Sequence, residues 1–178
     1  MDNEVKYHHL RLFEAQNKAL LENSEVKMIE IFVPGIPRPG GSKRVWKNKY
    51  TGKFNTVDAG KYTKEWRAVV SHFANEAMRN KELLTGAVEL NIEFYFARPK
   101  SHYGTGRNSL KLKPSAPEHH TQKPDRTKLL RSTEDALKGI VWRDDSQVIG
   151  GDVRKDWTDT TYPTTPKPGA LIRIVEQK

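Results

Sequence analysis

The sequence predicts an α+β fold in which a single mixed β-sheet is flanked by helices. One observation is that residues 88–96 alternate apolar and polar side chains, which is typical of a strand with one buried face. Another is that residues 58–80 place apolar side chains at helical spacing. The 178 residues fit one domain, which we assign to residues 28–178, with residues 1–27 as an N-terminal helical extension.

The strands of this domain follow from local apolar patterns and turn residues. We expect strands over Met28–Val33, Val88–Phe96, Ile140–Trp142 and Ala170–Val175, and a segment Gln147–Arg154 that pairs back after Trp142. The final strand is expected at an edge or terminus of the sheet. The segments Pro34–Arg44 and Arg98–Gln122 are rich in proline, glycine and charged residues, so we expect loops there.

Two helices are expected in the domain. The first begins with Asp58 as its N-cap and ends near Asn80. Its buried stripe comprises Tyr62, Trp66, Val69, Val70, Phe73 and Ala77. The second runs from Arg126 to Lys138 and ends at Gly139, a residue suited to a left-handed cap. Its buried residues are Leu130, Thr133 and Leu137. The N-terminal extension carries a sparser helical stripe, Leu10, Phe13, Leu20 and Leu21.

The composition narrows the classes of partner and compartment. With 31 Lys and Arg against 22 Asp and Glu, the chain has a net charge of +9, so we expect an anionic partner, although a basic surface also serves solubility alone. The absence of cysteine excludes disulfides and thiolate metal sites. No apolar run is long enough for a signal peptide or a transmembrane helix, so we expect a cytoplasmic protein with no membrane partner.

The charges are unevenly distributed along the chain. Residues 34–67 contain nine basic and two acidic residues, a net of +7, and residues 98–131 have the same balance. Residues 132–160 contain four basic and seven acidic residues, a net of −3. An acidic patch between two basic segments suits a nuclease, because basic segments bind the DNA backbone while acids hold a metal over one phosphate.

Five acids gather within a short stretch of the chain. They are Asp125, Glu134, Asp135, Asp144 and Asp145. Oxygen ligands of this kind bind hard divalent cations, so we expect Asp125, Asp144 and Asp145 to hold one or two Mg²⁺ ions that polarise a phosphate and activate water. Because Asp125 starts a helix and the aspartate pair follows a buried segment, the three are expected to converge at one sheet edge. In the alternative interpretation they are ordinary solvated residues.

Several histidines and aromatic residues also stand out. His119 and His120 precede the acids, but adjacent loop histidines are more often solvated or near phosphate, since hard cations prefer oxygen. Trp66 and Trp142 are expected in the core. Three aromatic residues in polar segments, Trp46, Tyr50 and Tyr103, are candidates for stacking on unpaired bases, with surface packing as the alternative.

These motifs together resemble the RusA-type Holliday junction resolvase family of bacteria and their phages. The resemblance covers Met28 to about Val175 and rests on Val33-Pro-Gly-Ile-Pro-Arg-Pro, the Tyr62 and Trp66 helix, Lys123-Pro-Asp125, Asp135-Ala-Leu137 and Asp144-Asp-Ser-Gln-Val148. It implies a homodimeric, Mg²⁺-dependent endonuclease, with Mn²⁺ as a substitute, that cuts four-way DNA junctions by paired incisions. The family's acids match Asp125, Asp144 and Asp145.

Two positions depart from the family's pattern. Thr127 stands where a second aspartate is found, and Arg131 replaces a lysine on the following helix. Arg131 or Lys128 is expected to stabilise charge that builds on the phosphate. Asp135 is expected either to join the metal ligands or to pair with Arg131 four residues before it. The residues expected to contact DNA phosphates beyond the cut are Lys43, Arg44, Lys47, Lys49 and Lys123.

Three functions are consistent with the sequence. The first is a metal-dependent endodeoxyribonuclease that acts on branched DNA in recombination and repair. The second is a DNA-junction binding protein of phage or prophage origin whose catalysis is weakened, because Thr127 supplies no charge. The third is a basic regulatory module in which the acids only cap helices.

Overall fold

The computed structural model describes residues 27–41, 43–58, 60, 62–158 and 167–177. The predicted helical extension, including its apolar stripe, therefore lies outside the described residues except for Lys27. No helix in these described ranges combines the length and apolar character needed to cross a membrane.

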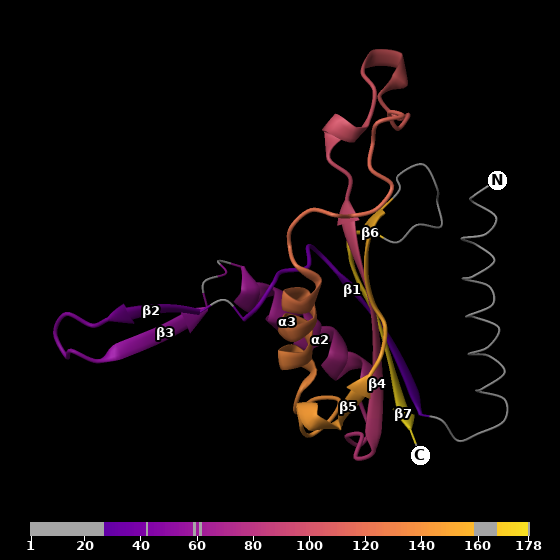
Figure 1. Ribbon diagram of the computed structural model, residues 1–178. Helices are drawn as coiled ribbons and strands as arrows, with labels where there is room; N and C mark the ends of the chain where they lie inside the picture. Colours follow the sequence, from indigo (N-terminus) through magenta and orange to yellow (C-terminus); the bar gives the residue numbers. More distant parts are fainter. Residues whose placement is uncertain (1–26, 42, 59, 61, 159–166, 178) are drawn as a thin grey trace.

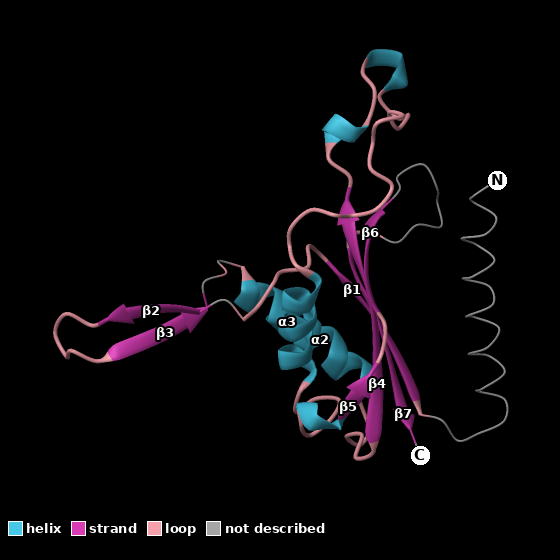
Figure 2. Ribbon diagram, in the orientation of Figure 1, coloured by secondary structure: helices cyan, strands magenta, loops and turns pink. Residues whose placement is uncertain are grey.

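The described chain forms one mixed five-stranded sheet, which confirms the predicted α+β class (Figure 2). Its strands are β1 (Met28–Pro34), β4 (Ala87–Ala97), β5 (Val148–Gly150), β6 (Val153–Thr158) and β7 (Gly169–Gln177). β7 pairs antiparallel with β1 on one side and with β4 on the other. β5 and β6 both pair parallel with β4 along its other edge. β7 is thus an interior strand, and the prediction that it lies at an edge is wrong.

Two helices cover the same face of this sheet, α2 (Thr63–Ala77) and α3 (Arg126–Leu137) (Figure 1). The inward residues of β4 alternate as predicted, and the core they share with the helices includes Trp66, Val70, Phe94, Leu129, Leu137 and Trp142. The two predicted core tryptophans are therefore confirmed. In α3 the fully buried leucines are Leu129 and Leu137, while Leu130 is half-buried.

A β-hairpin of β2 (Lys43–Lys47) and β3 (Phe54–Asp58) projects from the body of the molecule (Figure 1). The predicted loop is found at residues 35–41, but the prediction that it reaches Arg44 is wrong, as is the prediction that Asp58 caps the following helix. Asp58 is the last residue of β3, and α2 starts only at Thr63, after Tyr62 at the N-cap. The hairpin was missed because its side chains are not sorted into one apolar and one polar face.

The segment after α3 is also a turn and not the predicted strand. Gly139 has a φ of 77°, which confirms the left-handed cap. Val141 and Trp142 are buried, and the carbonyl of Val141 accepts a hydrogen bond from the backbone N–H of Leu84 at 2.8 Å. This apolar run, in which Ile140 is half-buried, forms a turn that anchors the end of α3 to the segment before β4.

Residues 98–122 form an irregular projection with two short 3-10 helices, η1 (Lys100–His102) and η2 (Gly106–Asn108). At its base the ring of His120 packs against Phe96 and Trp157, with centroid distances of 4.3 and 4.2 Å. His120 is buried, so it differs from the solvated or phosphate-contacting histidine that the sequence suggested. Tyr103 is also buried, so surface packing, and not base stacking, accounts for it.

The buried position of His120 predicts a pH-dependent stability. Burial lowers the pKa of His120, and Lys155 adds to this effect, while its own backbone and Asp156 oppose it. The folded chain therefore rejects a proton that the unfolded chain binds, so this contribution is full above pH of about 6.5 and falls as the pH drops below that value. Between pH 7 and pH 5, the melting temperature of the wild type should fall more than that of His120→Gln, measured by circular dichroism.

The exposed neighbour His119 provides the control for this experiment. The variant His119→Gln should retain the wild-type dependence of the melting temperature on pH. Parallel curves for wild type and His120→Gln would contradict the assignment of the pH dependence to the buried ring.

Candidate active site

Asp125 lies at the N-terminus of α3, where it is the N-cap residue. Its carboxylate makes no capping hydrogen bond and is 57% exposed, with the Lys128 ammonium 3.4 Å away. Thr127 lies in the first turn of the same helix and is exposed. This end of α3 therefore presents one accessible acid beside a cation, and Thr127 adds a hydroxyl but no charge.

Asp144 and Asp145 lie beyond the other end of α3. The Lys138 ammonium is 2.7 Å from Asp144 Oδ2 and 3.6 Å from Asp145 Oδ2, so both carboxylates converge on one cation. The indole N–H of Trp142 donates to Asp145 Oδ1 at 3.2 Å. The hydrogen bond from Lys138, together with that from the Ser146 backbone, holds the pKa of Asp144 far below its usual range. The two carboxylates are therefore already arranged around a positive charge.

The aspartate pair is held in place by Gln147. Asp144 caps the 3-10 helix η3 (Asp145–Gln147), accepting from the Ser146 backbone N–H at 3.0 Å. The side-chain oxygen of Gln147 accepts from the backbone N–H groups of Arg143 and Asp144, and its amide donates to the carbonyls of Leu84 and Gly86. One side chain thus ties the acidic turn to the start of β4.

The donor chemistry of the aspartate pair fits Mg²⁺. This ion usually takes one or two carboxylates and fills its other positions with water and substrate phosphate. Asp144 and Asp145 present two carboxylates to one position, which the Lys138 ammonium occupies. A complete set of three or more acidic or histidine ligands is not found within the described residues.

The predicted convergence of Asp125 with the aspartate pair is not found within one chain. Asp125 precedes α3 and the pair follows it, and a helix of 12 residues is roughly 18 Å long. Neighbouring contacts agree with this separation. Arg126 donates to the carbonyl of Val153 on β6, whereas Trp142 lies beside Leu84, before β4 begins. The two groups of acids therefore occupy opposite ends of the helix.

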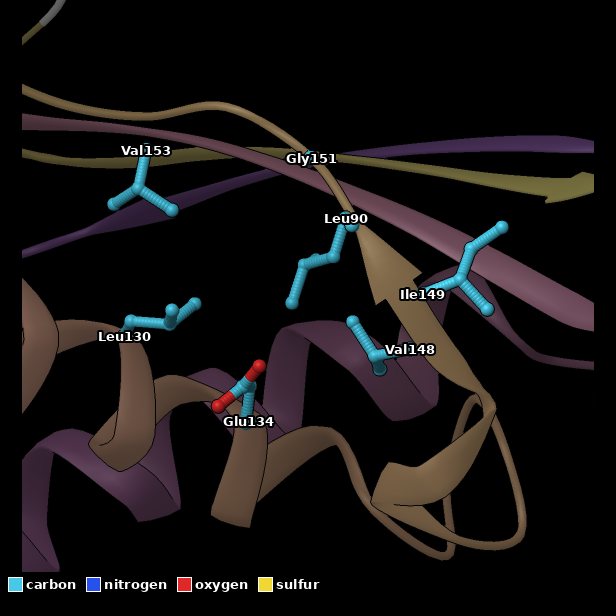
Figure 3. A pocket seen from close by; sticks show the side chains of 8 residues that line it. Leu90, Leu130, Glu134, Val148, Ile149, Gly151 and Val153 are labelled. Atoms are coloured by element: carbon cyan, nitrogen blue, oxygen red, sulfur yellow. The ribbon is translucent and has the colours of Figure 1, made fainter.

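Two further acids lie near the C-terminal end of α3. Glu134 points into a cavity of about 240 Å³ between α3 and β5, lined by Leu130 and Val148 among others (Figure 3). Burial raises the pKa of Glu134, and the nearby charges of Asp145 and Asp135 add to the effect. Asp135 forms a salt bridge of 2.5 Å with Arg67 on α2. The expected partner was Arg131, so the ion pair joins two helices and not two turns of one helix.

Arg131 lies where the projecting hairpin joins the body. The backbone N–H of Gly40 donates to the Lys128 carbonyl at 2.8 Å, which fixes the segment before β2 on α3. Gly41 has a φ of 84°, and a Cβ there would stand 2.8 Å from Arg131 Cδ. The positive φ favours glycine at this position, and the missing side chain leaves room for the exposed Arg131 at the base of the hairpin.

The predicted DNA contacts lie on two parts of the surface. Lys43 and Arg44 are in β2, Lys47 follows them on the same strand, and Lys49 is at the tip of the hairpin. Lys123 is exposed and precedes Pro124, next to Asp125. The hairpin and the N-terminal end of α3 thus carry basic residues on the side of the molecule where Arg131 lies.

Sequence reasoning missed the parts played by Lys138, Gln147 and Arg67. Lys138 reads as an ordinary basic residue at a helix C-terminus, and Arg67 as an exposed position of α2. A signal for Gln147 was available, because an aspartate followed three residues later by glutamine is a capping box. The ion pairs had no comparable signal, since they depend on how α2, α3 and the following turn pack.

The hydrogen bonds of Gln147 predict a specific loss of stability. Gln147→Ala leaves two backbone carbonyls and two backbone N–H groups without their partner, so the free energy of unfolding should fall by about 2 kcal/mol. The melting temperature should fall by about 4–8 °C. Replacing the exposed Gln122 with alanine is the matched control and should change it little. Equal melting temperatures for the two variants would contradict the role of Gln147.

Comparisons with known proteins show the family of the chain. The family described as endodeoxyribonuclease RusA matches residues 34–165 of the chain, which include α3, the aspartate pair and the hairpin. A protein of Bacillus subtilis (strain 168), described as "Uncharacterized protein YqaN", is 32% identical over 143 residues, which are 78% of this chain and 87% of that protein. The resemblance inferred from the motifs is confirmed, and the chain belongs to the RusA family of endodeoxyribonucleases.

Proposed function

We propose that this protein is a Mg²⁺-dependent endodeoxyribonuclease that resolves four-way DNA junctions by paired hydrolysis. The observation that carries the proposal is the pair Asp144 and Asp145, which converges on a cation in a chain of net charge +9. The family supplies the general activity, endonuclease action on DNA. The metal, the form of the substrate and the dimer are the parts that we add.

Asp144 and Asp145 are the residues proposed to hold the metal. Both are about half exposed, and the Lys138 side chain between them is 44% exposed, so it is able to swing away when a divalent ion takes its place. A bound Mg²⁺ ion would polarise the scissile phosphate and favour attack by water. Trp142 holds the carboxylate of Asp145 and Gln147 holds the backbone of Asp144, so the turn needs little reorganisation when the ion binds.

The cationic residues near Asp125 are proposed to bind the substrate phosphate. Lys128 and Arg131 are exposed, and both lie on α3 within two turns of Asp125. Their charges would stabilise negative charge that builds on the phosphate during cleavage. Lys47, Lys49 and Lys123 would contact phosphates farther from the cut, where they add affinity without sequence information.

The separation of the acids supports a dimer with shared sites. One chain holds Asp125 and the aspartate pair at opposite ends of α3, roughly 18 Å apart. A two-fold axis beside α3 would place Asp125 of one subunit against Asp144 and Asp145 of its partner, and would do so twice. Two sites related in this way also suit paired incisions in a junction of approximately two-fold symmetry.

An apolar surface beside α3 is available for such an interface. Leu130 of α3 and Val148 of β5 line the cavity next to Glu134, and Ile149 beside them is 66% exposed. Burying these side chains against a second copy would remove apolar area from water, at about 25 cal/mol per Å². We therefore propose that the dimer interface lies at the edge formed by β5 and α3.

The metal assignment predicts a separation of cleavage from binding. Asp145→Asn should reduce the rate of junction cleavage by about 100-fold or more, because a lost metal ligand costs several kcal/mol of transition-state stabilisation. Junction affinity in EDTA should stay the same or rise, since a negative charge near phosphate is removed. Cleavage of synthetic junctions in Mg²⁺ and Mn²⁺, with gel binding in EDTA, measures both quantities.

Asp152→Asn is the matched control, because Asp152 is an exposed acid of the turn between β5 and β6. It should cleave at the wild-type rate, and an Asp145→Asn rate within tenfold of wild type would overturn the assignment. A wild-type protein that binds junctions but cleaves none in either metal would instead be the weakened junction-binding protein, consistent with Thr127 in place of an acid.

Shared sites predict complementation between two inactive variants. In a mixed dimer of Asp125→Asn and Asp145→Asn, one site carries both substitutions and the other carries none. Mixing the two proteins should therefore restore single nicks to about a quarter of the wild-type level, while each variant alone stays inactive. Sites contained within one chain would give no recovery. Sedimentation at micromolar concentration should show a dimer for every variant, and a monomer would contradict the proposal.

A further inference from the structure

The β2–β3 hairpin exposes an unusual amount of aromatic surface. Tyr50 is 99% exposed, Phe54 72% and Trp46 47%. These rings lie on an arm that projects from the body, so they contribute little to the core (Figure 1). Large apolar side chains that are exposed together often mark an interaction site.

The tip of the hairpin has a defined backbone. The side-chain oxygen of Asn48 accepts from the backbone N–H groups of Tyr50 and Thr51 at 2.8 and 3.1 Å. The Asn48 backbone also bonds to both Gly52 and Lys53, which closes the turn. Tyr50 is therefore presented at the end of the arm by a turn that is fixed before any partner binds.

The aromatic residues face in different directions. In the pairing of β2 with β3, Trp46 is opposite Asn55, whereas Phe54 is opposite Lys47. Since opposite residues share a face and neighbouring residues along a strand do not, Trp46 and Phe54 lie on opposite faces of the hairpin. Tyr50 occupies the tip between them. A flat protein partner would cover only one of these faces, whereas a cavity between separated strands surrounds all three rings.

The charge of the arm selects an anionic partner. Residues 45–56 contain Lys47, Lys49 and Lys53 and no acid. The ammonium of Lys47 lies 5.9 Å from the centre of the Phe54 ring, so base-stacking and phosphate-binding groups are interleaved. Alternation of lysines and exposed rings is the combination with which proteins bind unpaired nucleic-acid strands.

The position of the arm relative to the candidate active site indicates which part of the DNA its tip can reach. Its base is fixed beside Lys128 and Arg131 through Gly40 and Gly41. Strands of five residues extend roughly 17 Å, so Tyr50 lies well beyond a phosphate that is held at the base. In branched DNA the groups found at that distance from a bound phosphate include the bases at the branch point.

We propose that the β2–β3 hairpin is a wedge that enters the centre of branched DNA, where Tyr50 stacks on an unpaired base while Lys47, Lys49 and Lys53 contact the surrounding phosphates. The inference deepens the proposed function, because it names how a branched substrate is distinguished from a duplex. A linear duplex offers phosphates to the lysines but no unstacked base to Tyr50, so the ring adds affinity only where bases are unpaired.

The test compares binding of a four-way junction and of a linear duplex in EDTA, so that cleavage plays no part. Tyr50→Ala should weaken junction binding by about tenfold and duplex binding by less than about twofold, since one stacked base contributes 1–3 kcal/mol. Tyr50→Phe should bind as the wild type does, because it keeps the ring. Leu110→Ala, at a residue 74% exposed on a different projection, is the matched control and should bind normally.

A fluorescent 2-aminopurine base at the branch point reports stacking directly. Its emission should be quenched on binding of the wild type and of Tyr50→Phe, and should change much less with Tyr50→Ala. The wedge would be overturned if Tyr50→Ala lost junction and duplex affinity equally. It would also be overturned if Tyr50→Ala quenched the fluorescence as strongly as the wild type does. A shift of Tyr50→Ala from dimer to monomer in sedimentation would overturn it too, because it would make the tip a protein interface.

These outcomes are independent of the catalytic proposal. If the wild type prefers junctions but cuts none, the proposed nuclease function is wrong. The wedge still holds in that case, provided that Tyr50→Ala loses the preference for junctions. A wild type that cuts junctions, with Tyr50→Ala binding equally well, would remove the wedge and leave the nuclease function in place.

Discussion

The packing of α3 against the sheet is the constraint on which the candidate site depends. Leu129 and Leu137 are fully buried, so neither end of the helix is free to move. That rigidity fixes the distance between Asp125 and the aspartate pair at about the length of the helix, roughly 18 Å. No rotation of side chains closes such a gap. The acids therefore act either separately within one chain or together across two chains. If they act together, hydrolysis requires a dimer.

The molecule combines a rigid acidic centre with basic projections. Gln147 and Trp142 hold the aspartate pair by hydrogen bonds to the body, which keeps two like charges close together around Lys138. The lysines of the hairpin stand on an arm with no core of its own. Separating the two functions in this way lets the arm adapt to DNA while the geometry that matters for hydrolysis stays fixed.

Much of this architecture could be predicted from sequence, for identifiable reasons. The alternation in β4 and the stripe containing Trp66 reflect burial on one face, which any sequence with such a face must show. The hairpin was missed because Trp46 and Phe54 face opposite ways and both meet solvent, so no periodicity arises. The expected convergence of Asp125 with Asp144 overlooked the length of the helix predicted between them, and the partners Arg67 and Lys138 depended on tertiary packing.

The central place of β7 has a consequence for synthesis of the chain. β1 and β4 do not pair with each other, and the strand that joins them is formed by residues 169–177, the last element of the described chain. During translation β1 stays unpaired, and β4 keeps one edge open, until β7 leaves the ribosome, and long-range pairing of this kind is slow. An unfinished chain therefore lacks a closed core. A nuclease built in this order has no complete sheet to position its acids until residues 169–177 have been synthesised.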